Sequence, residues 1–345
     1  MGLNLTGEIM KEAMFYTPDQ NNRVRCGLCR FNCLISDGAR GICAVRENRS
    51  GILYSLVYGK VIAEHVDPIE KKPLFHVLPG STTYSIATSG CNFHCHHCQN
   101  YTISQVNSSN PIRGNDRSPE EIVAAALKDN CRSISYTYTE PTIFYEFAYD
   151  TAHLARQAGL ANIFVTNGYI SKAALAEIAP CLDAANIDLK GFSEEFYRNI
   201  VNARLSEVLD SIIEYRKLGI WIEITTLIIP GLNDSDGDLR GIATFIASNL
   251  GTDTPWHVSQ FYPTYQLNNH PRTPISTLRR AVETGKAAGL KYVYEGNVPG
   301  DGGESSRCPS CSQMLIERYG YKILSNNISG GSCPNCGLKI PGIGI

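Results

Sequence analysis

From residue 82 onward, short apolar runs alternate with longer segments whose apolar residues recur at helical spacing. The short runs predict strands at residues 82–88, 132–138, 161–166, 184–189, 220–229, 256–261 and 291–295. The longer segments predict amphipathic helices at residues 118–128, 143–158, 172–178, 205–218, 238–248 and 277–288, the first with Ser118 as N-cap. Repeated β-then-α order predicts a parallel α/β sheet, closed or partly closed into a barrel, with its chemistry in the loops after the strands.

The pattern changes on both sides of this repeat. Short Gly-interrupted segments fill the N-terminal part, where residues 52–58 and 60–65 predict a hairpin around Gly59. Residues 67–73 hold two prolines and are interpreted as a connector. The tail is rich in Gly, Ser and Cys. We therefore expect an N-terminal unit at residues 1–80, a barrel at residues 81–300 and a small C-terminal unit at residues 301–345.

Composition places the chain among globular proteins. Hydrophobic residues make up 43% of the 345 residues and charged residues 19%, which excludes disordered and collagen-like classes. The net charge of -2 gives no global basic field for nucleic acid or anionic membrane. No apolar run approaches the ~18 residues of a membrane span, and the N-terminus lacks a secretory signal pattern. We expect a cytoplasmic protein.

Cysteine is the unusual component. Without a secretory context, thirteen cysteines indicate metal binding rather than a disulfide scaffold. Eleven of them fall into three sets: an N-terminal set of Cys26, Cys29, Cys33 and Cys43, a central set of Cys91, Cys95 and Cys98, and a C-terminal set of Cys308, Cys311, Cys333 and Cys336. Each set predicts its own metal site.

The central set follows the first predicted barrel strand. Its C-x3-C-x2-C spacing suits three irons of a cubane [4Fe–4S] cluster, because thiolate is the usual protein ligand of such clusters. A set of three leaves the fourth iron open to an external ligand, unlike an ordinary electron-transfer cluster. The alternative is a zinc site that combines two of these thiols with His94, His96 or His97.

The outer sets differ in what they predict. Two C-x2-C pairs flank a hairpin-like segment at residues 314–324, which predicts a zinc ribbon, with rubredoxin-like iron as the competing occupant. The N-terminal set suits either zinc or an auxiliary [4Fe–4S] cluster. We favour zinc there, because C-x2-C pairs in small loop-rich units usually serve structure.

The central triad resembles that of the radical S-adenosylmethionine (SAM) superfamily. The surrounding strings are similar to those of AmmeMemoRadiSam-system radical SAM proteins, relatives of pyruvate formate-lyase activating enzymes: Asp67-Pro68-Ile69-Glu70-Lys71-Lys72-Pro73, Cys98-Gln99-Asn100, Thr139-Glu140-Pro141-Thr142, Asp188-Leu189-Lys190, Ile229-Pro230-Gly231-Leu232-Asn233-Asp234 and Gly296-Asn297-Val298-Pro299-Gly300. The resemblance covers nearly the whole chain. It implies a partial (β/α)6-type parallel barrel, a small N-terminal cysteine unit and a zinc-ribbon-like tail.

The resemblance also implies cofactors and site residues. Cys91, Cys95 and Cys98 would ligate the [4Fe–4S] cluster, whose open iron chelates SAM. The residues that would contact SAM are His97, Glu140, Thr166, Asn167, Asp188, Lys190 and Asn297. The sequence departs from the family pattern at two places: Tyr138 and Thr139 replace two glycines before Glu140, and Val165 stands where an Asp helps to bind a monovalent cation. By strand alternation alone, Glu223, Thr225 and His257 are further inward-facing candidates.

These features favour a radical SAM oxidoreductase that cleaves SAM to a 5'-deoxyadenosyl radical and abstracts a substrate hydrogen. An activating-enzyme-like reaction at a protein glycyl position is the first hypothesis; modification of another protein or peptide, or of RNA, is the alternative. The expected partners are an electron donor such as flavodoxin or ferredoxin and a protein substrate, with nucleic acid less favoured and no membrane. A hypothesis of another class is a non-catalytic zinc scaffold, which predicts zinc without iron.

Overall fold

The computed structural model describes residues 2–3, 9–109, 111–298 and 300–345. The chain divides into two compact units. The first unit comprises Met1–Val66, Thr83–His94 and Cys98–Asp183, and the second Asp67–Thr82, Cys95–His97 and Ala184–Ile345. Among the described helices, none has the length and apolar character needed to cross a membrane. The domain boundaries at residues 80 and 300 stay a prediction.

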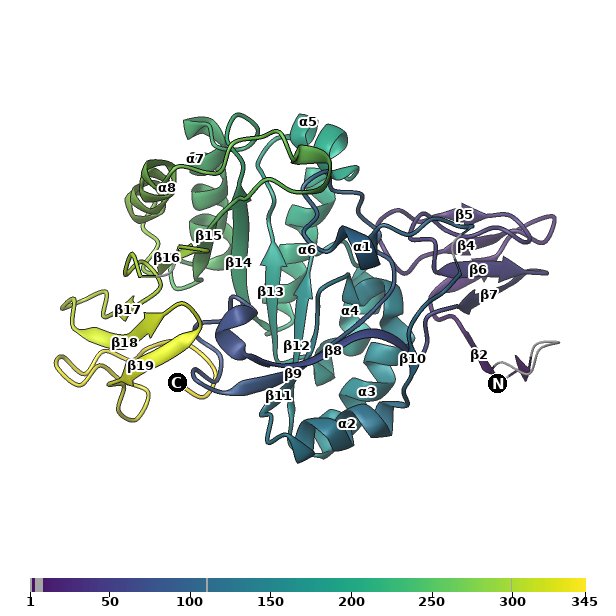
Figure 1. Cartoon of the computed structure of the whole chain (residues 1–345), viewed down its shortest axis with the longest axis horizontal. Helices are drawn as coiled ribbons and strands as arrows, with labels where there is room; N and C mark the ends of the chain where they lie inside the picture. Colours follow the sequence, from purple (N-terminus) through teal and green to yellow (C-terminus); the bar gives the residue numbers. More distant parts are fainter. Residues whose placement is uncertain (1, 4–8, 110, 299) are drawn as a thin grey trace. The chain divides into compact units, whose positions relative to one another are not determined.

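Parallel strands form the centre of the first unit. β9, β11 and β12 pair in parallel in that order, and β8 and β10 continue the sheet beyond β9 (Figure 1). Their bounds are Lys60–Pro68 for β8, Thr82–Thr88 for β9, Asn115–Asp116 for β10, Ser133–Tyr136 for β11 and Ala161–Thr166 for β12. Nearly every residue of β9 is buried, as expected for a parallel strand that is covered on both faces.

The helices predicted at residues 118–128, 143–158 and 172–178 are present in this unit, and a short helix at residues 101–104 was not predicted. The helices of the unit are α1 (Tyr101–Ser104), α2 (Pro119–Lys128), α3 (Tyr145–Gln157) and α4 (Lys172–Ile178), with the 3-10 turns η2 (Pro141–Phe144) and η3 (Ala179–Cys181). The start of α2 confirms Ser118 as the N-cap and shows a full capping box: Ser118 Oγ accepts the Glu121 N–H at 3.2 Å, and the Glu121 carboxylate accepts the Ser118 N–H at 2.7 Å.

Two small antiparallel sheets make up the N-terminal part. One has the order β1-β2-β7-β6 and the other β3-β4-β5. Their bounds are Gly2–Leu3, Ile9–Glu12, Tyr16–Pro18, Val24–Cys26, Leu34–Ile35, Arg46–Arg49 and Ile52–Ser55 for β1 to β7.

The predicted hairpin around Gly59 is wrong. β7 pairs with β2 and β6, whereas β8 joins the large sheet. Gly59 has φ +71° and accepts the Arg117 N–H through its carbonyl at 2.8 Å, and a Cβ there would lie 2.9 Å from the Arg117 carbonyl oxygen. The glycine therefore allows a close approach of two backbones at the sheet edge rather than a tight hairpin turn.

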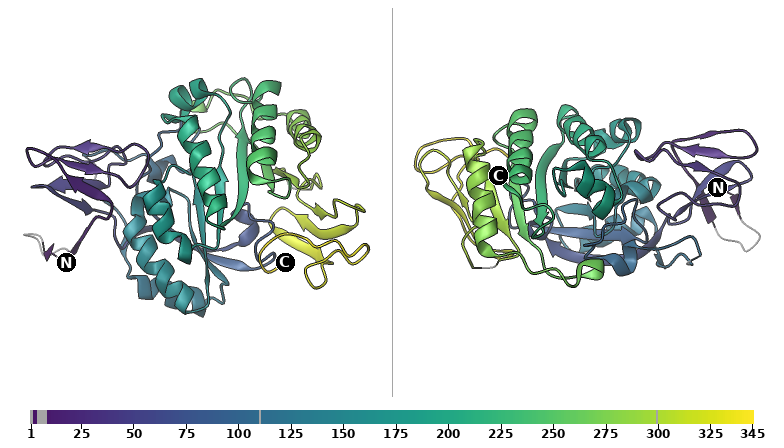
Figure 2. Two further views of the ribbon diagram at one scale, coloured as in Figure 1. Left: turned by 180° about the vertical axis from the view of Figure 1, so that it is seen from behind. Right: turned by 90° about the horizontal axis from the view of Figure 1, so that it is seen from above.

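The second unit continues the β/α repeat. β13, β14, β15 and β16 pair in parallel in chain order, with bounds Ala184–Asp188, Trp221–Ile228, Trp256–Gln260 and Val293–Gly296. Its helices are α5 (Glu194–Phe196), α6 (Leu205–Lys217), α7 (Asp236–Phe245) and α8 (Ile275–Ala287), with a 3-10 turn η6 (Tyr265–Leu267) and two π-helical turns, η4 (Tyr197–Val201) and η5 (Ile246–Leu250). Figure 2 shows the green helices lying along one side of the green strands. Parallel β/α order in both units confirms the predicted α/β partial-barrel class.

The segment interpreted as a connector is buried. After β8, the 3-10 turn η1 (Ile69–Lys71) leads into backbone that packs on β13 and β14 of the second unit. Glu70 is 1% exposed and Lys72 is 2% exposed, and the Lys72 ammonium contacts the Asp67 carboxylate at 2.7 Å. Charged residues thus tolerate burial here because each has an ionic partner nearby.

The tail is a three-stranded antiparallel sheet, drawn in yellow in Figure 1. Its strands are β17 (Ser306–Arg307), β18 (Met314–Tyr319) and β19 (Lys322–Asn326). β18 and β19 pair as the hairpin predicted for residues 314–324. Leu315, Ile316 and Ile340 form a small apolar core together with Cys308 and Cys333.

Candidate active site and metal centres

The loop after β9 carries the central cysteines, and polar groups contact the sulfur atoms of Cys91 and Cys98. In the first unit, the Phe93 N–H donates to Cys91 Sγ at 3.3 Å, and the Asn167 amide nitrogen lies 3.9 Å from the same sulfur. Cys98 Sγ contacts Ser104 Oγ at 3.1 Å. Donors of this kind stabilise the thiolate form that ligates iron.

Glu140 fastens the loops after β11 and β12 to each other. One carboxylate oxygen accepts from Thr142 N at 3.0 Å, Thr142 Oγ1 at 2.6 Å and Thr166 Oγ1 at 2.7 Å, and the other accepts from Asn167 N at 2.8 Å. Burial raises the pKa of Glu140 above its usual value, although these donors oppose the shift. The side chain therefore shapes the loop that carries Thr166 and Asn167, and its contact with SAM stays a prediction.

Asn167 connects that loop to the cysteine loop. Its amide nitrogen donates to Asn92 Oδ1 at 2.7 Å, and its amide oxygen accepts the Tyr169 N–H at 3.0 Å. Two buried polar atoms nearby, Asn92 Nδ2 and Thr88 Oγ1, have no hydrogen-bond partner among the described residues. Buried hydrogen-bonding groups are almost always paired in native proteins, so these atoms are consistent with a site that binds a polar ligand beside Cys91.

The second unit carries the other predicted SAM contacts. Lys190 Nζ contacts the Asp188 carboxylate at 2.8 Å at the end of β13. Burial opposes the charge of Lys190, but Asp188 and then Cys95 outweigh it and hold the pKa of this ammonium above its usual value. Asp188 and Lys190 thus form an ion pair beside Cys95.

His97 lies in an apolar setting. Its ring stacks on Phe196 with centroids 6.3 Å apart, and its Nδ1 atom has no partner among the described residues. Burial, followed by the positive charge of Lys190 and by His96, lowers the pKa of His97 to about 3. The imidazole is therefore neutral at neutral pH and presents an aromatic face, as the predicted contact with adenine requires.

Asn233 is a positioning residue to which the sequence analysis assigned no role. Its amide oxygen accepts the Ile229 N–H at 2.6 Å, and its amide nitrogen donates to the carbonyl oxygens of Lys190 at 2.6 Å and Leu227 at 2.9 Å. It thereby holds the end of β14 against the backbone of Lys190. The signal was the asparagine three residues after Pro230, directly beyond a predicted strand.

Glu223 and His257 are buried near the amino ends of their strands, away from the carboxyl ends that lead into the loops of the proposed site. They are the third residue of β14 and the second of β15, and Glu223 contacts His257 Nε2 at 2.7 Å. The Glu223 carboxylate also accepts the N–H groups of Phe75 and His76 at 3.0 and 2.8 Å. These residues anchor the buried segment before β9. Thr225 accepts from Asn186 Nδ2 at 2.8 Å.

Asn297 occupies the turn after β16. It has φ +63°, and its amide nitrogen donates to the Gln260 carbonyl at 3.1 Å. Its side chain therefore ties this turn to the end of β15. Pro299, in the same quoted string, lies outside the described residues.

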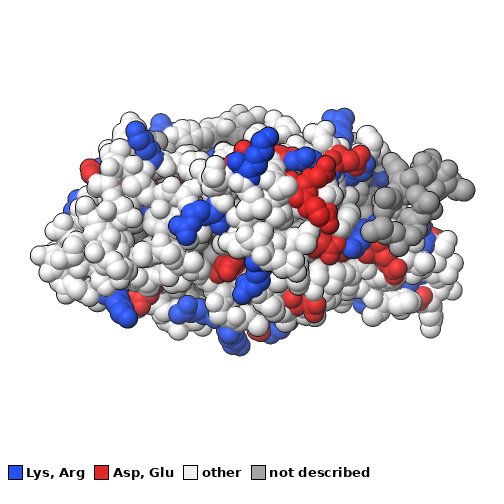
Figure 3. Space-filling model, turned by 90° about the horizontal axis from the view of Figure 1, so that it is seen from below, with Lys and Arg blue, Asp and Glu red and all other residues white. Residues whose placement is uncertain are grey.

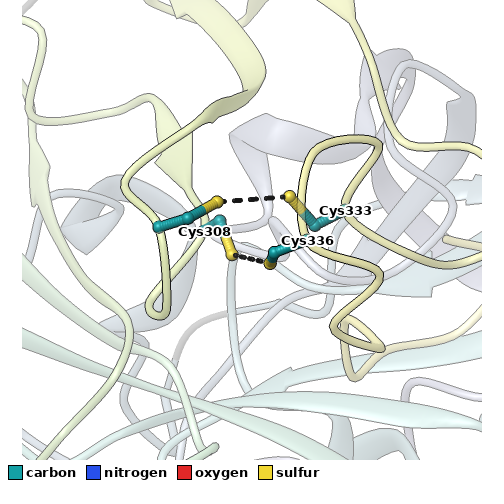
Figure 4. A group of neighbouring side chains, drawn as sticks. Cys308, Cys333 and Cys336 are labelled. Atoms are coloured by element: carbon teal, nitrogen blue, oxygen red, sulfur yellow. Dashed lines mark hydrogen bonds between the residues drawn. The ribbon is translucent and has the colours of Figure 1, made fainter.

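The C-terminal set forms a closed thiol site (Figure 4). Cys308 and Cys336 have sulfur atoms 3.6 Å apart, as do Cys311 and Cys333, and all four sulfurs lie within 4.8 Å of one another. Tetrahedral zinc with Zn–S bonds of ~2.3 Å separates its sulfur ligands by about 3.8 Å. The geometry fits the predicted zinc ribbon, and an iron of the same coordination fits equally well.

The N-terminal set is arranged more openly. The Cys26 N–H donates to the Cys33 carbonyl at 2.9 Å, and a Cβ on Gly41 would lie 3.9 Å from the sulfur atoms of both Cys33 and Cys43. Burial raises the pKa of the Cys29, Cys33 and Cys43 thiols, and the neighbouring cysteines add to the shift. Across the described residues, only the C-terminal set gathers three or more ligand atoms as tightly as a single ion requires.

Comparisons with known proteins relate the chain to a family and to two archaeal proteins. The profile of the radical SAM superfamily matches residues 85–243. An uncharacterized protein of Methanocaldococcus jannaschii is 49% identical over 333 residues, which is 96% of this chain and 99% of that protein. A second M. jannaschii protein, provisionally named a glycyl-radical enzyme activating enzyme, is 27% identical over 221 residues, or 62% of this chain and 79% of its own. A solved domain of a pyruvate-formate lyase-activating enzyme from Bacteroides vulgatus superposes with a TM-score of 0.42 at 18% identity, covering 48% of this chain and 99% of that domain.

Proposed function

Because the chain belongs to the radical SAM superfamily, we propose that Cys91, Cys95 and Cys98 hold a [4Fe–4S] cluster whose open iron binds SAM. The observation that supports this best is the pair of donors at Cys91 Sγ beside the unpartnered amide nitrogen of Asn92. When bound, the two cofactors supply one-electron cleavage of SAM and a carbon-centred radical that removes a hydrogen atom from the substrate.

The residues of the chain bind and orient these groups. In the first unit, Asn167 fixes the cysteine loop, and Glu140 holds Asn167 in place through its backbone N–H. Thr166 is held by the same carboxylate. In the second unit, we assign the Asp188–Lys190 pair to the polar end of SAM, because a fixed ion pair offers both a donor and an acceptor.

Two further residues complete the proposed SAM site. We assign His97 to the adenine ring, because its imidazole is neutral and stacks on Phe196, which leaves it an aromatic surface. We also assign Asn297, in the turn after β16, to the adenine end of SAM.

For the substrate we propose another protein, modified by hydrogen abstraction at a glycyl position. The name of the second M. jannaschii relative supports this choice, as does the resemblance of the quoted strings to AmmeMemoRadiSam-system proteins. RNA is less favoured: the net charge is -2, and on the face in Figure 3 Lys and Arg side chains are interleaved with Asp and Glu. None of the thirteen cysteines, all of which are described, forms a disulfide, so we propose a reducing, cytoplasmic setting.

The test is anaerobic reconstitution followed by an assay of SAM cleavage. With dithionite and SAM, we expect slow release of 5'-deoxyadenosine that the Cys95→Ala variant abolishes and the Cys181→Ala variant retains. Cys181 is the matched control because it is a buried thiol outside the three sets. Zinc without iron, and no cleavage of SAM, would contradict the proposal and favour the scaffold hypothesis.

A further inference from the structure

The N-terminal cysteine set packs directly against the loops that carry the central site. The Arg30 N–H donates to the Tyr169 carbonyl at 3.1 Å, and the Ser171 N–H donates to the Leu28 carbonyl at 3.0 Å. Cys29 and Ile170 thereby form an antiparallel β-bridge. Cys29 is thus joined to the backbone only three residues beyond Asn167, whose amide contacts the Cys91 loop.

A second contact reaches the residue before Cys91. Gly90 has φ +102°, and a Cβ there would lie 2.7 Å from Val45 Cγ1 and 3.1 Å from the Cys43 carbonyl oxygen. Since consecutive Cα atoms are ~3.8 Å apart, this contact places the Cα atoms of Cys43 and Cys91 within about 11 Å of each other. Two of the four N-terminal cysteines are therefore neighbours of the central site through separate contacts.

The N-terminal sulfurs are not packed together as the four ligands of a single ion are, which favours a cluster over one ion. A single tetrahedral ion needs its thiolates as close as those of the C-terminal set, and across the described residues the N-terminal set does not gather in this way. In a [4Fe–4S] cluster each thiolate binds a different corner of the cube, so the four sulfurs stand further apart. A full set of four thiolates also leaves no open iron for SAM.

We infer that Cys26, Cys29, Cys33 and Cys43 bind a second iron–sulfur cluster, which passes electrons to the cluster at Cys91, Cys95 and Cys98. The inference rests on the proposed function. A reduced protein of the ferredoxin or flavodoxin class loses one electron and the second cluster gains it. The second cluster is then reoxidised as the same electron reduces the central cluster. No bond is formed or broken and no proton moves in this step.

The first test counts metals in the reconstituted full-length protein. We expect about eight irons with matching sulfide and about one zinc, which the C-terminal set holds. About four irons and two zincs would overturn the inference while leaving the proposed function intact. This count needs no variant, so it is decisive even if a variant fails to fold.

The second test uses the Cys33→Ala/Cys43→Ala double variant, with Cys95→Ala as its counterpart. We expect each variant to keep about four irons, those of its remaining cluster. Addition of SAM should change the electron paramagnetic resonance signal of the double variant, which keeps the central cluster, and leave that of Cys95→Ala unchanged. If SAM changes no signal in the wild type while both variants keep four irons, the second cluster stands and the proposed function falls. If the double variant keeps all the iron of the wild type, the inference falls.

The third test separates electron transfer from structural support. SAM cleavage by the double variant is measured with dithionite, which reaches exposed clusters directly, and with a purified ferredoxin and its reductase. We expect the ferredoxin-driven rate to fall at least about tenfold further than the dithionite-driven rate. Equal losses under both reductants would show that the N-terminal unit only supports the loops, and would overturn the inference.

Discussion

The N-terminal and C-terminal cysteine sets have the same four ligands but are built into the fold differently. The C-terminal sulfurs lie within 4.8 Å of one another above an apolar core of their own. Cys33 and Cys43 flank Gly41, the Cys43 backbone packs against Gly90 after β9, and the backbone on either side of Cys29 bonds to the loop after β12. A closed thiol set with its own core is typical of a structural metal, and the more open set attached to the loops of the proposed site is the one to which we assign the second cluster.

The segments that carry the N-terminal and C-terminal cysteine sets also make their contacts at different ends of the strands. The N-terminal contacts fall at Gly90 and Ile170, which follow the carboxyl ends of β9 and β12. In the second unit, the tail bonds to the segment around His76, which Glu223 anchors near the amino end of β14. Because barrel enzymes build their sites at the carboxyl ends of the strands, these N-terminal contacts fall at the end where we propose the active site, and the tail contacts at His76 fall at the other end.

The largest effect is expected from removing one ligand of the closed site. Cys333→Ala should melt the tail, because bound zinc supplies most of the folding free energy of such small units, about 10–16 kcal/mol in isolated fingers. Hydrogen exchange of residues 306–340 should rise sharply, while the strands β13–β16 stay protected. Cys181→Ala is the control. Unchanged protection of the tail would mean that its apolar core folds without metal.

The next effect concerns the close contact at Gly90. Gly90→Ala should lower the free energy of unfolding by about 2–4 kcal/mol, because the new methyl group meets Val45 and the Cys43 carbonyl at a strained positive φ. Gly159→Ala is the matched control: it also has positive φ (+77°), but nothing lies within 4 Å of its Cβ, so it should cost only about 1 kcal/mol. Urea unfolding measures both. Equal losses would show that the packing of Cys43 on Gly90 contributes nothing.

A smaller effect is expected at the link between the loops. Asn167→Ala removes the amide that bonds Asn92 and approaches Cys91, and should weaken SAM binding about tenfold at unchanged iron content. SAM titration followed by electron paramagnetic resonance gives the affinity. Asn249→Ala serves as control, since its amide nitrogen donates to the carbonyl of Phe245 at a helix end, away from the cysteine loop. Iron loss in Asn167→Ala would instead give this residue a role in holding the cluster.

The regular part of the barrel was predictable because its signals are local. The strand at residues 82–88 and the helix at residues 172–178 match β9 and α4 at both ends, and the Ser118 cap is formed as predicted. Thiol spacing gave the C-terminal site for the same reason, since each C-x2-C turn brings two ligands together.

Long-range pairing was not predictable. A glycine between two strand-like runs gives the same pattern whether the strands pair with each other or, as at Gly59, with distant partners. The β-bridge between Cys29 and Ile170 joins residues far apart in the sequence, and neither residue type predicts this pairing. Residues 67–73 are interpreted only as a connector, because the buried ionic partners of Glu70 and Lys72 are visible only in the fold.

The smallest expected effect concerns the pH dependence of stability near His76, to which the tail bonds. In the second unit, the His76 ring contacts the Pro341 carbonyl and the Tyr294 hydroxyl. Burial lowers the pKa of His76; Glu223 opposes this shift, and Arg318 and His257 add to it. The unfolded state therefore binds the proton more readily, so stability is lost as pH falls through the unfolded pKa of ~6.5, by at most about 1.4 kcal/mol per pH unit. His76→Gln should flatten the pH dependence of the urea midpoint between pH 7 and 5. If the pH dependence of the urea midpoint is unchanged in His76→Gln, the contacts that hold the tail near the amino end of β14 do not titrate in this range.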